Sequence, residues 1–437
     1  MAFGSRRRRG MGVALAFLFF AVPAAAQDAP VAARTVTLRE ALELARATAP
    51  SMIAAQGAVD IAEANQLQTR GSLLPSLTAN GSFSNSSNER FDQSTGRLVS
   101  QNYSAALQAG YDIFTGGRRV AQLRGAGADV DAAEANRRAE WFATTLVTTQ
   151  AFYETAAAGD IVRSADQRLQ RARQQLSFAQ TRLEVGTATQ SDVLRAELEV
   201  GNAELALIDA QTALRSGMLQ LGRLIGVAEP VAAEPLALPT EAPTLPAAEE
   251  LIRRAMLASP DVLAAEAELD SRSADRLESL LAYAPTLRLT GGYDWFSFDF
   301  PPDEQSWNLR LTASMPLFNN FGREAAVQRA NANRRVAEAR ARDTQIAVRA
   351  AVDAAASEVR AAERRVTIAD RAVELAREDL RVQEERYQIG AATILDLQTS
   401  QVALTDAEIA AVRTRQDLGT AVAQLEAVLG ETITEAR

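Results

Sequence analysis

Apolar and polar residues alternate in four stretches of this chain, at residues 77–83, 103–113, 287–295 and 307–315. A period of two is typical of a β-strand with one apolar face and one polar face. The strands reach about ten residues or more and carry aromatic residues towards their ends, as strands of outer-membrane barrels do. We therefore expect four membrane-spanning strands, although the alternation by itself leaves a soluble β-sandwich open.

Longer patterns of helical period follow each pair of strands, at residues 118–184 and 323–388. At about 1.5 Å per residue, each helix would be about 100 Å long. In the second pattern valine recurs every seventh residue and alanine fills the other seam position, which predicts a closely packed coiled coil. The seam comprises Val352, Val359, Val366, Val373, Leu380 and Tyr387, with Ala355, Ala362, Ala369 and Ala376.

Glycine ends both long patterns, at Gly186 and Gly390, and a further helical pattern then runs to Gly226 or Gly430. A glycine just after the last helical residue is the usual left-handed C-cap. Each long helix therefore predicts a helical hairpin with a glycine at its tip.

The whole pattern occurs twice. Adding 204 maps the first tip glycine onto the second, and adding 210 maps Pro75 onto Pro285. These two prolines end shorter amphipathic helices, which we predict at residues 37–74 and 247–282. The loops between the paired strands, expected at residues 87–98 and 299–306, differ in length and explain most of the change from 210 to 204. A duplicated unit of this kind must be identified before a fold is assigned.

The duplication divides the chain. We expect a first repeat at residues 27–228, a proline-rich linker at 229–246 and a second repeat at 247–437. The first 26 residues predict a secretory signal peptide, with four arginines, a short apolar stretch and an Ala-Ala-Ala cleavage site. A membrane anchor is the alternative, but the apolar stretch is shorter than the roughly 20 residues that a span needs.

Composition excludes several kinds of site. The chain has no His and no Cys, which removes the commonest metal ligand, the usual general base, disulfides and thiolate chemistry. Removal of the signal peptide changes the net charge from −9 to −13, which argues against nucleic acid as a partner. We find no nucleophile elbow, phosphate loop or metal-binding motif, so we expect no enzyme, no catalytic or metal site and no cofactor.

Four strands are too few to close a membrane barrel, because known barrels have about eight or more. An open sheet edge in lipid leaves backbone groups unpaired, at several kcal/mol each. Membrane strands in this chain therefore require several copies, each contributing four strands. The long helices would then continue the barrel as a tube on the periplasmic side.

This organisation resembles the TolC-like outer-membrane efflux and secretion ducts over residues 35–430. The tips carry the most specific part of the resemblance. The first contains an arginine followed by Val-Gly-x-x-Thr, from Arg182 to Thr189, and the second copy runs from Arg386 to Thr393 with Ile in place of Val. An acidic residue follows each threonine by three positions.

The resemblance implies a mainly α-helical chain with a small transmembrane β part. Three copies would form a periplasmic α-barrel of antiparallel coiled-coil helices and a shared twelve-stranded β-barrel in the outer membrane lipid. The homotrimer would be the passive exit duct of a tripartite efflux or type I secretion system. A periplasmic adaptor (membrane fusion) protein would connect it to an inner-membrane transporter of the RND, ABC or MFS type. Because the chain has no Cys, it is expected among members without a lipid anchor.

The expected site residues fall into three groups. Asp396 matches the first acidic residue of the family's periplasmic aperture, and Thr399 stands at the second, so we expect a single acidic ring. The membrane-interface aromatics are Tyr103, Tyr111, Tyr293, Trp295 and Trp307. The adaptor-docking tips comprise Arg182, Leu183, Val185, Gly186, Thr187 and Thr189, with Arg386, Tyr387, Ile389, Gly390, Ala391 and Thr393.

Simpler interpretations exist for each group. The tip glycines act first as helix caps, Asp396 suits the first turn of any helix, and the aromatic residues suit the core of a soluble sheet. For the whole chain the alternative is a periplasmic coiled-coil scaffold or surface protein without transport activity. That alternative explains the heptads but not the four alternating strands. The sequence does not indicate the substrate.

Overall fold

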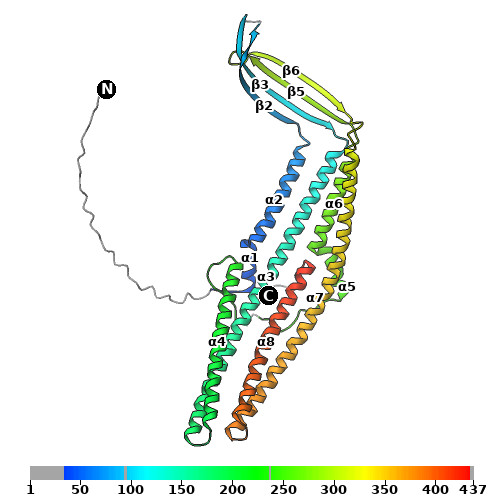
Figure 1. The fold of residues 1–437 in the computed structure, drawn as a ribbon. Helices are drawn as coiled ribbons and strands as arrows, with labels where there is room; N and C mark the ends of the chain where they lie inside the picture. Colours follow the sequence, from blue (N-terminus) through cyan, green and yellow to red (C-terminus); the bar gives the residue numbers. More distant parts are fainter. Residues whose placement is uncertain (1–33, 93–95, 236–237, 434–437) are drawn as a thin grey trace, which may run out of the picture. The chain divides into compact units, whose positions relative to one another are not determined.

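The computed structural model describes residues 34–92, 96–235 and 238–433, all of which belong to one compact unit. The predicted signal peptide lies outside the described residues. In this unit the four alternating stretches form one antiparallel sheet in the order β2-β3-β5-β6 (Figure 1). The strands are β2 (Ser76–Asp92), β3 (Arg97–Phe114), β5 (Thr286–Ser297) and β6 (Glu304–Ser314).

The loop predicted at residues 87–98 is wrong, because β2 and β3 extend well into it. Apolar alternation stops near residue 83, and the remainder of β2 is almost wholly polar. Backbone pairing continues across this segment, with a register shift between Asn85 and Arg90. The hydrogen-bond ladder does not require apolar side chains, so the alternating pattern marks only part of each strand.

The registers of the two strand hairpins confirm the duplication. Ser76 lies opposite Gly110 in the first hairpin, and Thr286 lies opposite Ser314 in the second. Adding 210 to the first residue and 204 to the second converts one pair into the other. The same conversion holds for the pairs that follow, as far as Asn85 opposite Gln101.

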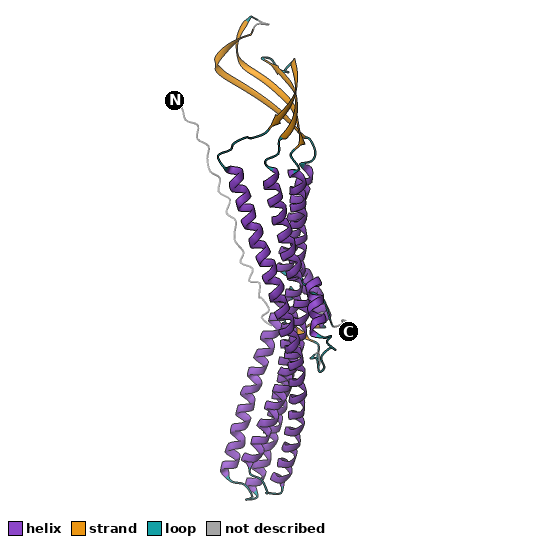
Figure 2. Cartoon of the chain, turned by 90° about the vertical axis from the view of Figure 1, so that its right-hand side faces the viewer, coloured by secondary structure: helices purple, strands orange, loops and turns teal. Residues whose placement is uncertain are grey.

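The long helices begin and end almost where the sequence places them. They are α3 (Arg118–Glu184) and α7 (Gly322–Gln388), of 67 residues each, and they return through α4 (Gln190–Leu224) and α8 (Ile394–Leu429). Figure 1 shows α3 and α7 running from the sheet to the hairpin tips and α4 and α8 returning part of the way, and Figure 2 shows the same helical part from the side. The predicted seam of α7 is confirmed, because three of its four valines and three of its four alanines are buried, many of them against neighbouring helices, α8 among them.

The single helices predicted before each strand pair are wrong, because each is broken at a proline. The structure has α1 (Leu38–Thr48) and α2 (Pro50–Gly71) in the first repeat, and α5 (Ala248–Ala258) and α6 (Pro260–Leu281) in the second. The residue before each proline is extended, with ψ 125° at Ala49 and 124° at Ser259. Proline excludes its predecessor from the helical region but is favoured as the first residue of a new helix.

The linker also contains an element that the sequence does not reveal. Strand β4 (Val231–Ala233) pairs in parallel with β1 (Arg34–Val36), and the amide of Glu234 donates to the carbonyl of Val36 at 3.1 Å. Val36 and Val231 are buried in a core cluster with residues of α1, α3 and α4. Strands of three residues are too short to produce a readable alternation. No helix within the described residues combines the length and the apolar character needed to cross a bilayer.

Both return helices end against the short helices at a glycine. Gly226 and Gly430 have positive φ values of 75° and 71°. A Cβ at Gly430 would lie 2.4 Å from the carbonyl oxygen of Ala258, and one at Gly226 would lie 2.7 Å from Cβ of Thr48. Each position therefore needs glycine for its backbone conformation and for the close approach of a neighbouring helix.

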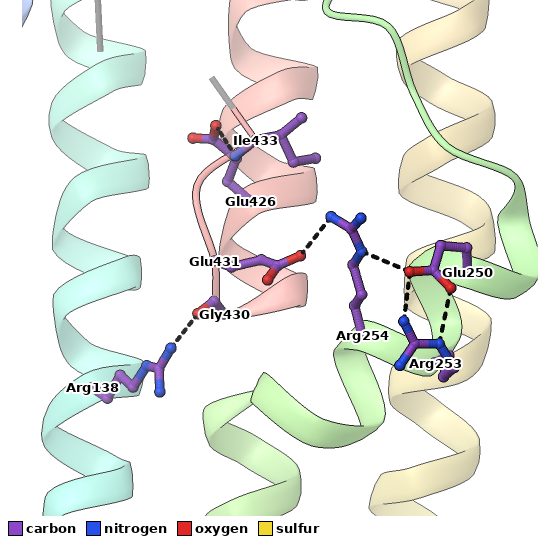
Figure 3. Close-up of polar contacts among 8 residues, drawn as sticks. All are labelled: Arg138, Glu250, Arg253, Arg254, Glu426, Gly430, Glu431 and Ile433. Carbon is purple, nitrogen blue, oxygen red and sulfur yellow. Dashed lines mark hydrogen bonds and ion pairs between the residues drawn. The ribbon is translucent and has the colours of Figure 1, made fainter. Parts of the chain in front are cut away.

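Polar contacts fix the end of α8 at this level of the molecule (Figure 3). Arg138 of α3 donates to the carbonyl of Gly430 at 2.7 Å. Arg254 of α5 joins Glu250 to Glu431, at 3.0 and 3.5 Å. Hydrogen bonds from Arg253 and Arg254 lower the pKa of Glu250 to about 2. The group links α3, α5 and the residues that follow α8.

Two glycines with nearly the same backbone conformation test the close approach. We expect Gly390→Ala to cost about 1 kcal/mol, because a left-handed alanine is strained but the tip is otherwise open. Gly430→Ala carries the same strain and must also displace the Ala258 backbone, which adds about 1–3 kcal/mol. Thermal unfolding followed by circular dichroism should therefore show the larger loss of apparent Tm for Gly430→Ala. Equal losses would contradict the packing argument.

Candidate functional site

The two hairpin tips have the same backbone geometry. Gly186 and Gly390 both have a φ of 75°. The amide of Thr187 donates to the carbonyl of Arg182 at 2.8 Å, and that of Ala391 donates to the carbonyl of Arg386 at the same distance. No atom from elsewhere in the described chain lies within 4 Å of a Cβ placed on either glycine. The glycines are therefore left-handed caps, as predicted, and they stand in open space.

A capping box starts each return helix. The amide of Asp192 donates to the hydroxyl of Thr189 at 3.3 Å, and the Thr189 amide donates to the Asp192 carboxylate at 2.8 Å. Thr393 and Asp396 repeat the arrangement at 3.2 and 2.9 Å. Each threonine and aspartate thus satisfies backbone groups that would otherwise lack partners at the helix start.

The position of Asp396 bears on its expected place at the aperture. Hydrogen bonds from the Thr393 hydroxyl and amide lower the pKa of the Asp396 carboxyl group, which is exposed and charged at neutral pH. Asp192 makes the same two contacts in the first repeat. The carboxylate therefore has a structural role in the helix start, and its role at an aperture remains a prediction.

Arg182 joins the two tips within the chain. Its guanidinium donates to the carbonyl of Tyr387 at 3.1 Å and lies 5.2 Å from the centroid of the Tyr387 ring. Phe178 lies on α3, as Arg182 does, and its ring centroid is 5.9 Å from the same guanidinium. Tyr387 is buried, and burial raises the pKa of its hydroxyl. Below this contact, Leu183 packs against a shared apolar cluster of α3, α4, α7 and α8. Arg182, Leu183 and Tyr387 are therefore largely occupied by contacts within the chain.

Other predicted tip residues face outward. Val185 and Ile389 occupy equivalent positions and are 68% and 80% exposed. Thr187 and Ala391 follow the glycines and are exposed as well. No contact within the described chain accounts for apolar side chains so exposed at the end of a polar helical hairpin.

Two further leucines close to the tips in the chain are exposed, and the sequence analysis missed them. Leu194 and Leu395 lie in the first two turns of α4 and α8 and are each more than half exposed. They were overlooked because they do not occupy matching positions in the two repeats. The available sequence signal was a leucine within two turns of a capping threonine, at a position outside the heptad seam.

The predicted interface aromatics lie at two levels of the sheet. Four belong to the half near the strand loops: Tyr103, Tyr293, Trp295 and Trp307. Tyr293 lies opposite Trp307, and its ring is 4.6 Å from that of Trp295. Tyr111 lies eight residues from Tyr103, near the helices, or about 27 Å along the strand at roughly 3.4 Å per residue.

Nothing in the described residues suggests a metal centre, since no group of three or more acidic residues is placed to hold an ion.

Comparison with known proteins now identifies the family. The model of the family described as outer membrane efflux protein matches residues 41–227 and 251–431, which together make up most of the chain. The chain belongs to the outer membrane efflux protein family. The match falls into two segments, in agreement with the duplication. It follows that the protein is an outer-membrane channel with a long helical domain and not an enzyme.

Individual relatives agree over most of their length. Protein CyaE of Bordetella pertussis is 26% identical over 358 residues, which cover 80% of this chain and 75% of CyaE. The pyoverdine export outer membrane protein OpmQ of Pseudomonas putida is 26% identical over 393 residues, covering 85% and 81%.

Solved structures share the fold. CusC superposes with a TM-score of 0.78 at 19% identity, covering 90% of this chain and 92% of CusC. VceC of Vibrio cholerae gives 0.75 at 19% identity, covering 91% and 97%. At these identities the likeness concerns the fold alone.

Two threonines of α8 test the capping box. We expect Thr393→Ala to speed amide hydrogen exchange in the first turn of α8, because the Asp396 amide loses its acceptor. Thr399→Ala is the matched control, since its hydroxyl bonds only to the carbonyl of Leu395 within the helix. Exchange mass spectrometry at neutral pH measures the difference.

The pH dependence has a definite sign. The pKa of Asp396 is lowered on folding, so the stability that its ionised carboxylate adds to the folded state is fully present above the ordinary pKa of about 3.9. This stability is lost as pH falls through the lowered pKa.

Equal exchange in the Thr393→Ala and Thr399→Ala variants at neutral pH would show that the capping box does not hold the helix start.

Proposed function

We propose that the protein is the passive exit duct of a tripartite efflux or type I secretion system and works as a homotrimer. Three copies would supply twelve strands, enough to close a β-barrel in the outer membrane, whereas the four strands of one chain leave β2 and β6 as free edges. The two levels of aromatic residues support strands that cross the membrane, with Tyr111 on the periplasmic side and the strand loops on the outer side. Strands tilted by about 40° would reduce their separation to about 20 Å in height, comparable with the roughly 25 Å apolar band of such barrels.

The observation that carries the proposal is the pair of exposed apolar residues at the tips. Val185 and Ile389 are exposed at equivalent positions of the hairpin tips, and the tips lie at the end farthest from the sheet (Figure 2). A trimer would present six such tips in a ring. Apolar anchors surrounded by polar groups are suited to a protein partner, and a periplasmic adaptor is the partner that a duct of this kind requires. Thr187, Thr189, Arg386, Gly390, Ala391 and Thr393 complete the proposed docking surface.

The duct itself needs no energy source and no shaped substrate pocket. An inner-membrane transporter of the RND, ABC or MFS type, reached through the adaptor, would supply both selection and energy. Relatives of this chain include one named for pyoverdine export and one, from Cupriavidus metallidurans, named for cobalt-zinc-cadmium resistance. Such different names within one family support a duct whose cargo is chosen by its partners.

A single acidic ring is the proposed constriction at the periplasmic mouth. Three copies of Asp396 would carry three negative charges, because the pKa of this carboxyl group is lowered. Thr399, one turn further along α8, has no charge, and its hydroxyl donates to the carbonyl of Leu395 at 2.8 Å. The electrostatic barrier would therefore be one ring deep.

Single cysteines at the tips test adaptor docking, since the chain has no cysteine of its own. We expect Thr187→Cys and Ala391→Cys, each in its own variant, to be crosslinked in living cells to a periplasmic adaptor identified by mass spectrometry. Thr212→Cys is the control, because Thr212 is exposed on α4 about 33 Å from the first tip at roughly 1.5 Å per residue.

The outcomes separate the interpretations. Capture of the adaptor from both tips and not from Thr212 supports docking through the tips. Capture of nothing, by protein that reaches the outer membrane, would mean that the tips are only helix caps. Where an adaptor is captured, the genes beside its own gene would indicate the class of cargo.

A further inference from the structure

The two repeats meet within the chain along one continuous seam. Strand β3 pairs with β5, and α6 packs between α3 and α7. Their counterparts at the outer sides of the chain have no such neighbour. Strands β2 and β6 are the edges of the sheet. Of the two 67-residue helices, α2 packs against α3 alone, whereas its counterpart α6 packs against both. Figure 1 shows α2 and α7 on opposite flanks of the helical layer.

Burial shows which face of α2 lacks its partner. Five residues of α6 are buried, namely Pro260, Val262, Ala267, Ser271 and Ala274, whereas within the described chain α2 buries only Val59. Subtracting 210 places Ile61 where α6 has Ser271. Ser271 is 2% exposed and Ile61 is 65% exposed. None of the five equivalent positions on α2 is buried, since Pro50, Ile61 and Ala64 are exposed and Met52 and Gly57 are half-buried, and an isoleucine there replaces the serine of α6.

The internal seam is tightest where the strands join the long helices. Gly116 and Gly117 precede α3 with positive φ values of 66° and 86°. A Cβ at Gly116 would lie 2.2 Å from Cβ of Ala284, and one at Gly117 would lie 3.4 Å from Cδ1 of Leu281. The side chain of Leu281, at the end of α6, thus fills the space that Gly117 leaves.

The second repeat reverses the sizes at this junction. Adding 204 to Gly117 gives Phe321, which keeps the left-handed conformation with a φ of 61°. This conformation is strained for a bulky residue. The ring is 68% exposed and contacts only Phe318 among aromatic residues of the described chain, at 5.5 Å. Subtracting 210 from Leu281 gives Gly71, which has no atom from elsewhere in the described chain within 4 Å of a Cβ position.

We infer that neighbouring copies meet along a seam built like the internal one, with Phe321 seated on Gly71 of the partner subunit. In this seam β6 pairs antiparallel with β2 of the partner subunit, and Leu311 lies opposite Phe83 of the partner subunit. The inference rests on the proposed oligomer and specifies how its copies join. Large and small residues are exchanged across the junction, since Phe321 and Gly71 stand where the chain itself has Gly117 and Leu281.

The strand register follows from the internal one. Leu107 lies opposite Tyr293 in the chain, and the two offsets convert this pair into Leu311 opposite Phe83. The same conversion places Ala313 opposite Gly81. It also keeps Trp307, Leu309, Leu311, Ala313 and Met315 on the same face as Leu77, Ala79 and Phe83 of the partner subunit. A shift by one residue would put the apolar side of one strand beside the polar side of the other.

The junction itself is not an exact copy of the internal one. Asn320 and Leu74 replace Gly116 and Ala284, whose internal spacing leaves no room for a Cβ on the glycine. The two copies must therefore stand further apart at this level than the repeats do. A phenylalanine ring fills the wider gap, and Leu74, which is exposed in the single chain, lies beside it.

Disulfide trapping tests the register. Phe83→Cys is combined in turn with Leu309→Cys, Leu311→Cys or Ala313→Cys in the otherwise cysteine-free chain. We expect the most oxidised dimer and trimer, on non-reducing gels of outer membranes, for the Leu311 combination, because only directly opposed residues approach within disulfide range. A disulfide within one chain is excluded, since residues 83 and 311 lie on opposite edges of the sheet, which are separated by at least about 14 Å at roughly 4.8 Å per strand.

Each result has a clear meaning. A maximum at Leu309 or Ala313 would overturn the register. No crosslink in any combination, from protein that native mass spectrometry shows to be a trimer, would overturn the seam and leave the proposed duct intact. Monomeric protein in the outer membrane would overturn both.

A size exchange tests the junction. A Cβ at Gly71 meets no atom from elsewhere in the described chain, so we expect Gly71→Leu to lower the dissociation temperature of the oligomer through its clash with Phe321 of the partner subunit. Phe321→Gly should also lower that temperature, because the gap is left empty. The double variant restores the pairing found at Gly117 and Leu281 and should dissociate at a higher temperature than Gly71→Leu alone. Simple addition of the two losses would contradict the inference.

Discussion

Unpaired backbone groups along the two edges of the sheet are the constraint on which the rest of this structure depends. Strands β2 and β6 each present a row of amides and carbonyls without partners inside the described chain. In lipid each such group costs several kcal/mol, so the sheet is stable there only when both edges are paired. The duplication supplies the geometry for this pairing, because the chain already contains one junction between a second strand and a first strand, at β3 and β5. The long helices continue from the ends of these strands, so their lateral arrangement is fixed by the same pairing.

Small residues allow the helical part to follow the sheet. The seam of α7 buries valine alternating with alanine, and α3 likewise buries many alanines, which lets helices of 67 residues approach closely along their length. Glycine then ends each segment where the chain must turn or touch another helix. At Gly390 only the left-handed backbone demands it, whereas at Gly430 the carbonyl of Ala258 also leaves no room for a side chain. The helix length, the turn and the contact are thus set by local chemistry that occurs once in each repeat.

The order and bounds of the long elements can therefore be predicted from the sequence more fully than the contacts between them. The bounds of α3 and α7 could be predicted because proline is absent over their length and glycine marks their ends. The break before Pro50 was missed, although its cause is local, because the amphipathic pattern continues on both sides of it. The β1–β4 pair and the contact of Arg182 with Tyr387 join residues about 200 positions apart, and no local pattern records such partners. The docking surface was predicted from motif positions, but only the structure separates the exposed Val185 from the buried Tyr387.

The two repeats are alike where their surroundings are alike and differ where one is inside the chain and the other faces outward. The hairpin registers and the capping boxes match residue for residue, since each is built within a single repeat. At the seam, by contrast, α6 has a buried Ser271 that donates to Asp129 at 2.6 Å, whereas the corresponding Ile61 of α2 is exposed. Folding brings the internal partners together in one chain, so a polar contact is sufficient there. Separate copies must instead find each other, and burial of apolar surface supplies the non-directional attraction that such an association needs. The apolar residues on the outer flanks, Ile61, Leu74 and Phe321 among them, are thus explained as contacts that one chain cannot complete by itself.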